Sequence, residues 1–342
     1  MRAVTRHAHV NWPATLLVVA LPWLAAHWYG CGWEYAVAED GDASPADTGQ
    51  SEVSEAASDG TVVLPDGRVC KGHDEDQDGI PDECDNCPNV GNPGQETSGG
   101  SVVGSACTPS ASFVPSPSRL LFDPFRSLAE WKSYGSGTSA FQVGPDSDSV
   151  VAGSVTGEEL PFVAASSGAG TSAVVATTTL TITDEAATAP VGSAGLLLRI
   201  NGDPDKRFYV CVVGFRAGFA IAWTPTTGCN GGVCDVKTFA AAVDGGTVAY
   251  QAAIPTDIPH AMGDTVGLRA SVVSTATDGG FNTDIECRVF DPKRPSTLTS
   301  TAPQYAQKIT VGGARSFPAG EIGLYARRAR VSFGSIDLLR GP

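Results

Sequence analysis

Charged side chains are scarce in this chain, and basic ones are the scarcer. Only 17% of its 342 residues are Asp, Glu, Lys or Arg, and 22 basic residues face 37 acidic ones, giving a formal net charge of −15. An acidic surface repels phosphate backbones, which argues against nucleic acid as a partner. The same surface attracts divalent cations.

Histidine is rare as well. The chain has five, and only His73 and His260 remain once an export signal over residues 1–38 is removed. Two histidines offer little for a Ser-His-Asp site or for a metal held by imidazoles. We expect His260 to lie in a loop.

Long apolar runs are missing too. The longest, Ala14–Ala26, is too short to span a membrane comfortably, and Arg2 and Arg6 precede it. A basic start followed by a short apolar run predicts an export signal over residues 1–38. The chain is therefore expected outside the cell or on its outer surface.

The end of the signal has two readings. Gly30-Cys31 is similar to a lipoprotein cleavage site ending at residue 30, which would leave a lipid anchor on Cys31. Ala36-Val37-Ala38 has the small-x-small form of an ordinary cleavage site, which would free the chain. Both readings stay open.

The nine cysteines support export, because removing Cys31 leaves an even set. Our preferred pairings are Cys70–Cys84, Cys87–Cys107, Cys211–Cys287 and Cys229–Cys234. The rival interpretation is a zinc site, since Cys84-x-x-Cys87 has the spacing of metal ligands. An oxidising compartment favours disulfides.

Composition divides the chain into segments. Residues 39–66 are acidic and nearly free of aromatics, so we expect a disordered linker. Residues 67–108 form a small unit rich in Cys and Asp, and residues 109–118 a Pro/Ser linker. Residues 119–342 alternate apolar and polar side chains in short runs, with turns rich in Gly, Pro and Asp.

This alternation predicts an all-β domain, an antiparallel sandwich of two packed sheets. No convincing amphipathic helix of normal length is expected, and Pro124–Lys132 is at most a short one. The expected strands and the side chains on one face of each are as follows: Val174, Ala176, Leu180 and Ile182; Leu196, Leu198 and Ile200; Phe208, Val210 and Val212; Phe219, Ile221 and Trp223; Val266, Leu268, Ala270 and Val272; Ile285, Cys287 and Val289; Val331, Phe333, Ile336 and Leu338.

The segment Asp74–Asp85 has the pattern of a calcium loop. Carboxylates fall at every other position, and Gly79 stands where the chain must turn sharply around an ion. Calcium binds oxygen ligands, and closely spaced anions repel one another without a cation. The candidate ligands are Asp74, Asp76, Asp78, Asp82 and Asp85, with the backbone carbonyl of Ile80. An EF-hand is disfavoured, because no helices flank the loop and its last acid is Asp.

The run Asp74–Gln95, with Asp85-Asn86-Cys87-Pro88 and Asn92-Pro93-Gly94-Gln95, resembles a thrombospondin type 3 repeat. The resemblance implies the same calcium ligands and a unit with little core, folded by metal and disulfides. The family continues with a second Asp-rich run, but here Glu96–Gly100 lacks the acids. One calcium ion is therefore expected.

The large domain resembles the concanavalin A-like, laminin G-type superfamily. The resemblance rests on Phe125 followed by Trp131, on Gly195–Arg199 with the turn after it, and on Gly320–Ile336. It implies a jelly-roll β-sandwich, in a superfamily that includes lectins, adhesion modules and glycosidases.

No catalytic motif stands out. Glu158 and Glu159 are adjacent and would point apart in a strand, which leaves Asp284 and Glu286 as the one same-face pair of carboxylates. A solvent-facing strand surface is the favoured interpretation of that pair, so a catalytic role is not favoured. Sugar-stacking candidates, for each of which core packing is preferred, are Trp131, Trp223, Tyr250, Tyr305 and Tyr325.

The sequence thus favours an exported, calcium-binding surface protein. Its sandwich is expected to bind a glycan or a protein partner in adhesion or recognition, with the calcium unit as a rigid spacer. The alternatives are an extracellular carbohydrate-active enzyme and a purely structural envelope protein.

Overall fold

The computed structural model describes residues 61–64, 67–98, 100–109, 117–134, 141–152, 162–165, 172–186, 192–200, 208–216, 218–223, 248–312, 316 and 319–341. All of them belong to one compact unit, Glu55–Pro342. The expected signal peptide, Cys31, the Glu158-Glu159 pair and the Cys229–Cys234 pairing lie outside these residues. So do most of residues 39–66 and 109–118, assigned above to linkers.

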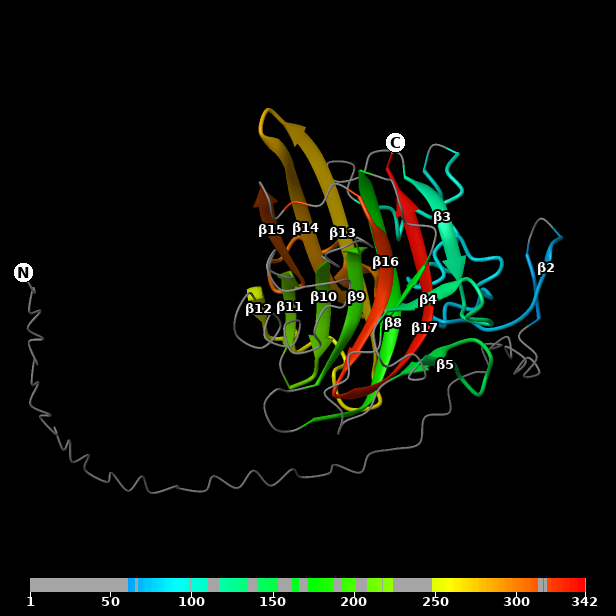
Figure 1. Cartoon of the computed structure of the whole chain (residues 1–342). Helices are drawn as coiled ribbons and strands as arrows, with labels where there is room; N and C mark the ends of the chain where they lie inside the picture. The colour runs from blue at the N-terminus through cyan, green and yellow to red at the C-terminus, as the bar shows by residue number, and fades with distance from the viewer. Residues whose placement is uncertain are drawn as a thin grey trace, which may run out of the picture. The chain divides into compact units, whose positions relative to one another are not determined.

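Strands make up nearly all of the regular secondary structure of the described residues (Figure 1). The strands are β1 (Val62–Val63), β2 (Val69–Cys70), β3 (Ser118–Asp123), β4 (Trp131–Tyr134), β5 (Phe141–Val143), β6 (Val150–Ala152), β7 (Phe162–Ala165), β8 (Ala173–Glu185), β9 (Ser193–Ile200), β10 (Tyr209–Gly214), β11 (Gly218–Trp223), β12 (Val248–Ala252), β13 (Thr265–Thr277), β14 (Gly280–Phe290), β15 (Ala306–Gly312), β16 (Glu321–Arg327) and β17 (Ala329–Arg340). The segment considered at most a short helix, Pro124–Lys132, holds a bend and a turn, and its last two residues belong to β4. A short helix, α2, spans Pro295–Thr299.

Two antiparallel sheets build the domain. One has seven strands in the order β12-β11-β10-β9-β16-β7-β4. The other has eight, in the order β15-β14-β13-β8-β17-β6-β5, with β3 pairing with β17 beside this path. The antiparallel β-sandwich predicted from the sequence is confirmed. No helix among the described residues is long and apolar enough to cross a membrane.

The core between the sheets follows the predicted alternation in most strands. Val174 and Leu180 of β8, Leu268 of β13 and Phe333 of β17 belong to one buried cluster with side chains of the seven-stranded sheet. In β17 the register shifts between Phe333 and Ile336, which explains the three-residue step in the apolar pattern.

Strand β10 departs from the prediction. The expected face, with Val210 and Val212, is buried outside the inter-sheet core, whereas Tyr209, Cys211 and Val213 belong to that core. Every residue of β10 is buried, so alternation alone could not decide which face looks inward. The predicted disulfide Cys211–Cys287 is confirmed, and it joins β10 of one sheet to β14 of the other.

Candidate metal centre

The loop Asp74–Asp85 is held without regular secondary structure. It contains only bends and turns, and no helix flanks it within residues 67–98, as expected for a site that is not an EF-hand. Gly79 has a φ of 95°, in the region that glycine adopts most easily. The turn that this glycine permits brings the chain back past Asp74.

Three predicted ligands converge. Asp74, Asp76 and Asp78 each place a carboxylate oxygen so that the three atoms lie within 4.8 Å of one another. The backbone N–H of Asp78 donates to Asp74 Oδ1 (3.2 Å) and to Asp76 Oδ1 (3.1 Å), and the N–H of Gly79 donates to Asp74 Oδ2 (2.8 Å). Backbone amides therefore aim the carboxylates at a common centre.

Asp76 carries the strongest sign of a missing positive charge. Its side chain is 1% exposed, and its Oδ2 is buried with no hydrogen-bond partner within the part of the chain that the structure describes. Burial, followed by the charges of Asp85, Asp78 and Asp74, raises the pKa of Asp76 to about 9. Burying an uncompensated carboxylate is costly, and a bound cation removes that cost.

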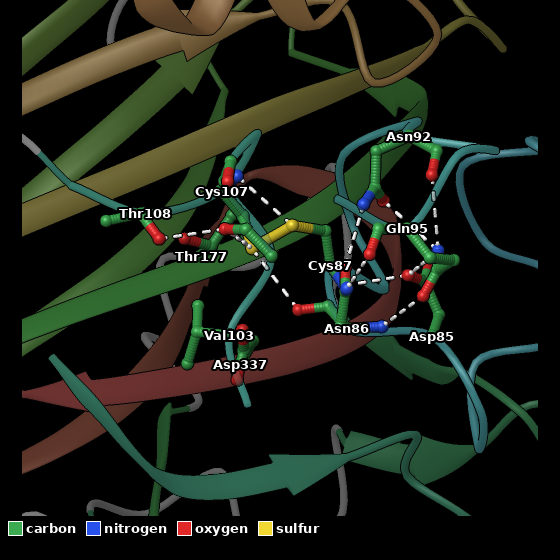
Figure 2. The surroundings of a disulfide bond; sticks show 12 residues. Asp85, Asn86, Cys87, Asn92, Gln95, Val103, Cys107, Thr108, Thr177 and Asp337 are labelled. Atoms are coloured by element: carbon green, nitrogen blue, oxygen red, sulfur yellow. Dashed lines mark hydrogen bonds between the residues drawn. A yellow bond between two sulfur atoms is a disulfide. The ribbon is translucent and has the colours of Figure 1, made fainter. Parts of the chain in front are cut away.

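The remaining predicted ligands lie around this group of three. Asp85 Oδ1 accepts from the N–H of Cys87 and from Gln95 Nε2, both at 2.7 Å (Figure 2). Asp82 Oδ1 accepts from the N–H of Glu75 at 2.9 Å. Burial raises the pKa of each of these two carboxyls to about 7.

The donor set fits a hard dication. Calcium in proteins takes about six to eight oxygen ligands from carboxylates, carbonyls and water. Three converging carboxylates, the nearby Asp85 and the carbonyl of Ile80 offer oxygens only. The three have no Lys or Arg salt bridge among the described residues. This chemistry suits calcium better than a metal that prefers nitrogen or sulfur.

Asn86, Asn92 and Gln95 hydrogen-bond to the loop through their backbone and amide groups, a role that was not predicted from the sequence. The N–H of Asn92 donates to Asp78 Oδ2 (2.7 Å), and Asn92 Nδ2 donates to Asn86 Oδ1 (2.7 Å). The N–H of Asn86 donates to Gln95 Oε1 (2.9 Å) (Figure 2). Because Gln95 also donates to Asp85, these residues hold the carboxylates of Asp78 and Asp85 in place. Their position in the run Asp74–Gln95 was the sequence feature that could have indicated this role.

Two disulfides frame the loop as predicted. Cys70–Cys84 and Cys87–Cys107 are both formed. Since Cys84 and Cys87 belong to different disulfides, neither is a thiolate, and the alternative of a zinc site at Cys84-x-x-Cys87 is excluded.

The loop unit packs on the sandwich rather than standing away from it. A second apolar cluster joins the Cys87–Cys107 disulfide to Val175 of β8, Leu339 of β17 and Phe290 of β14. Val175 alternates with Val174, which faces the inter-sheet core, so the unit covers the outer face of the eight-stranded sheet. The expectation of a unit with almost no core is wrong, because the unit shares this core with the sheet.

Polar contacts reinforce that interface. Glu75 accepts a short hydrogen bond from Thr179 Oγ1 of β8, and Ser335 Oγ of β17 donates to Asn89 Oδ1 (2.8 Å). Arg119 of β3 donates from Nη2 to the carbonyl of Asn86 (3.0 Å) while its Nε pairs with Asp337 (2.8 Å). Docking of this kind does not suit a spacer.

The carboxylate pair on β14 is engaged structurally. Asp284 Oδ1 accepts from Thr310 Oγ1 (2.5 Å), and Glu286 pairs with Lys308 (2.7 Å) and Arg288 (3.3 Å). These partners hold both acids on the outer surface of β14.

Among the aromatics considered for sugar stacking, Trp131 and Tyr325 are buried. Trp131 Nε1 donates to Asp123 Oδ2 (2.7 Å). Tyr305 donates a short hydrogen bond to Asp257 and packs partly against the core. The side chains of Trp223 and Tyr250 lie outside the described residues.

Neither a family model nor a curated protein sequence matches this chain. Solved structures with a similar arrangement include a protein of unknown function with a galectin-like fold from Bacillus subtilis, with a TM-score of 0.41 and 10% identity over 66% of this chain and 97% of that one. The Emp47p carbohydrate recognition domain has a TM-score of 0.38 and 12% identity, over 69% and 100%. The VIP36 exoplasmic/lumenal domain in its Ca²⁺/Man3GlcNAc-bound form has a TM-score of 0.36 and 11% identity, over 65% and 87%.

Proposed function

We propose that this chain is an exported calcium-binding recognition protein, in which one calcium ion fixes the loop unit onto a glycan-binding β-sandwich. The observation that carries the calcium proposal is Asp76, whose carboxylate is buried among other carboxylates with one oxygen lacking a partner among the described residues. A dication at that centre supplies the missing charge.

The proposed ligands are those of the thrombospondin type 3-like loop. Asp74, Asp76 and Asp78 are the central group, and the carboxylates of Asp82 and Asp85 with the carbonyl of Ile80 complete the shell. Asp82 must turn one oxygen toward the ion while the other keeps its bond to the N–H of Glu75. A carboxylate can do both, because each oxygen has two lone pairs.

Calcium has a structural consequence in this proposal. The same loop that binds the ion carries Glu75, which reaches Thr179 on the sheet, and leads into the Cys87–Cys107 disulfide of the shared apolar cluster. Because the contacts and the ligands alternate along one short segment, ordering the loop around calcium also orders the interface. Binding free energy thereby stabilises the sandwich.

The recognition role rests on the sandwich surface. Among its described residues, only Met262 and Phe281 are large hydrophobic side chains that are exposed, at 40% and 38%. The described sandwich surface thus shows no large apolar patch of the kind that marks some protein-docking sites, so we favour a glycan over a protein partner. Three disulfides suit an oxidising compartment, which supports export.

Isothermal titration of the calcium-free full chain with CaCl₂ tests the metal site. Asp76→Asn keeps the shape of the side chain and removes its charge, and we expect affinity to fall at least about tenfold. Asp278→Asn, at an exposed hairpin turn, removes the same charge far from the loop and is the matched control. Equal affinities for Asp76→Asn and the control would overturn the site.

A further inference from the structure

A cavity of about 390 Å³ lies at one end of the seven-stranded sheet. The turn between β10 and β11 supplies Phe215, Arg216 and Gly218, and the chain after β12 supplies Ala252–Ile254 and His260. The volume is within the range of small-ligand sites. None of these residues belongs to the calcium loop.

Glu185 holds the backbone of Phe215 and Arg216 at the wall of the cavity. Glu185, at the end of β8, accepts from the N–H of Phe215 (2.9 Å) and from the N–H of Arg216 (2.8 Å). Gly218 has a φ of 84°, and a Cβ there would lie 1.9 Å from the carbonyl oxygen of Ala252. The backbones of Gly218 in β11 and Ala252 in β12 therefore lie in close contact at the wall of the cavity.

The cavity presents uncommitted hydrogen-bonding groups. Arg216 is half exposed and meets Glu185 through Nε at 3.5 Å, while its two Nη groups make no hydrogen bond to the part of the chain that the structure describes. His260 Nδ1 lies 2.6 Å from the carbonyl oxygen of Ile258, so it carries the proton and leaves Nε2 available. Phe215 packs partly against the core and adds an apolar surface.

Charge decides between ligand classes. Glu185 is fully buried and neutralises Arg216, and the chain as a whole carries a formal charge of −15. An anionic ligand would gain little from a paired guanidinium and would be repelled by the surface. A neutral ligand with several hydroxyls avoids both penalties and still uses the Nη donors, because Arg216 meets Glu185 through Nε.

We propose that this cavity binds a neutral hexopyranose ring. The Nη groups of Arg216 donate to adjacent ring hydroxyls, His260 Nε2 accepts from a third, and the apolar face of the sugar lies against Phe215. This assignment rests on the glycan-binding role proposed above and names its ligand class. It adds a site that the sequence did not indicate, because the contributing residues are scattered through turns and a loop.

Ligand-observed NMR on the calcium-loaded full chain tests the assignment with methyl glucoside, methyl galactoside, methyl mannoside and methyl glucuronide. We expect at least one neutral hexoside to bind, and the glucuronide to bind more weakly than it. Arg216→Gln and His260→Ala should each weaken that binding about tenfold, the loss expected for a strong hydrogen bond. Arg330→Gln, at an exposed arginine on β17, is the matched control and should bind as the unmodified chain does.

The results distinguish the cavity assignment from the broader proposal that the sandwich binds a glycan. Unchanged thermal unfolding of the variants shows that any loss belongs to the cavity. Preference for the glucuronide overturns the neutral class, and equal binding by Arg216→Gln and the control overturns the cavity. A glycan array then distinguishes the levels: binding that persists in Arg216→Gln leaves glycan recognition standing without this site, whereas no binding by the unmodified chain overturns both.

Discussion

Arg269 of β13 donates a 2.7 Å hydrogen bond from Nη2 to the carbonyl oxygen of Cys107, which lies in the calcium unit 162 residues earlier in the chain. Its Nε donates to Thr177 Oγ1 of β8 at 3.1 Å. Arg269 is 5% exposed, and burial lowers its pKa to about 10, so it stays charged at neutral pH. A buried cation thus ties the sheet to the end of a disulfide.

Removing the Arg269–Cys107 hydrogen bond should lower the free energy of unfolding. Arg269→Met fills a similar volume but leaves the Cys107 carbonyl buried without its donor, which costs about 1–3 kcal/mol. Urea unfolding in saturating calcium measures the loss. Arg330→Met changes an exposed arginine on β17 and should cost much less; equal losses would mean that the Arg269–Cys107 bond contributes nothing specific.

Calcium should stabilise the whole domain and not the loop alone. At a calcium concentration about 100 times the Kd, linkage adds about 2.7 kcal/mol to the free energy of unfolding. The thermal midpoint of the sandwich should therefore rise with calcium, and limited proteolysis within residues 67–108 should become faster in EGTA. In Asp76→Asn both effects should shrink. A midpoint indifferent to calcium, in a chain that binds it, would show that loop and sandwich are not coupled.

The inter-sheet disulfide should stabilise the sandwich independently of calcium. Cys211 and Cys287 are 76 residues apart, and closing a loop of that length is worth about 4 kcal/mol in the chain-entropy account. The double variant Cys211→Ala/Cys287→Ala should lose stability of that order in guanidinium unfolding, at equal calcium affinity. A loss of calcium affinity in the double variant would mean that the disulfide supports the metal site, contrary to this prediction.

Sequence alternation predicted most of the sandwich because one face of most strands enters a single core. It failed at β10, where both faces are buried. The predicted Cys211–Cys287 disulfide, however, indicates which face of β10 points into the core between the sheets. A disulfide between sheets must point inward, and Tyr209 and Val213 share the face of Cys211.

The ligands of the loop could be predicted because they lie close together in the sequence. The docking of the loop unit on the sheet could not, because it depends on residues far apart in the chain. Asp74, Asp76 and Asp78 lie within one turn of chain, so their convergence follows from the sequence and from Gly79. The contact of Asn89 with Ser335 joins residues 246 apart and leaves no periodic trace. The sequence around Val175 predicts only a β-strand. No pattern near it indicates that the calcium unit packs against its side chain.

Gly334 of β17 offers the sharpest test of the docking. A Cβ at this position would lie 1.9 Å from Glu75 Oε2, so Gly334→Ala must displace the Glu75 side chain from Thr179. The clash is with the end of a side chain and not with backbone, so we expect only the loss of a hydrogen bond, about 0.5–1.5 kcal/mol, in urea unfolding with calcium present. Gly279→Ala, where a Cβ would meet nothing within 4 Å, is the matched control.

A double-mutant cycle with Glu75→Ala separates steric displacement from an effect on β17 itself. With the Glu75 carboxylate absent, the new methyl at position 334 has room, so the cost of Gly334→Ala should fall to nearly that of the control. A cost that stays the same in both backgrounds would mean that Gly334 is needed for the conformation of β17. In that case the close approach of Glu75 to the sheet would carry no stability.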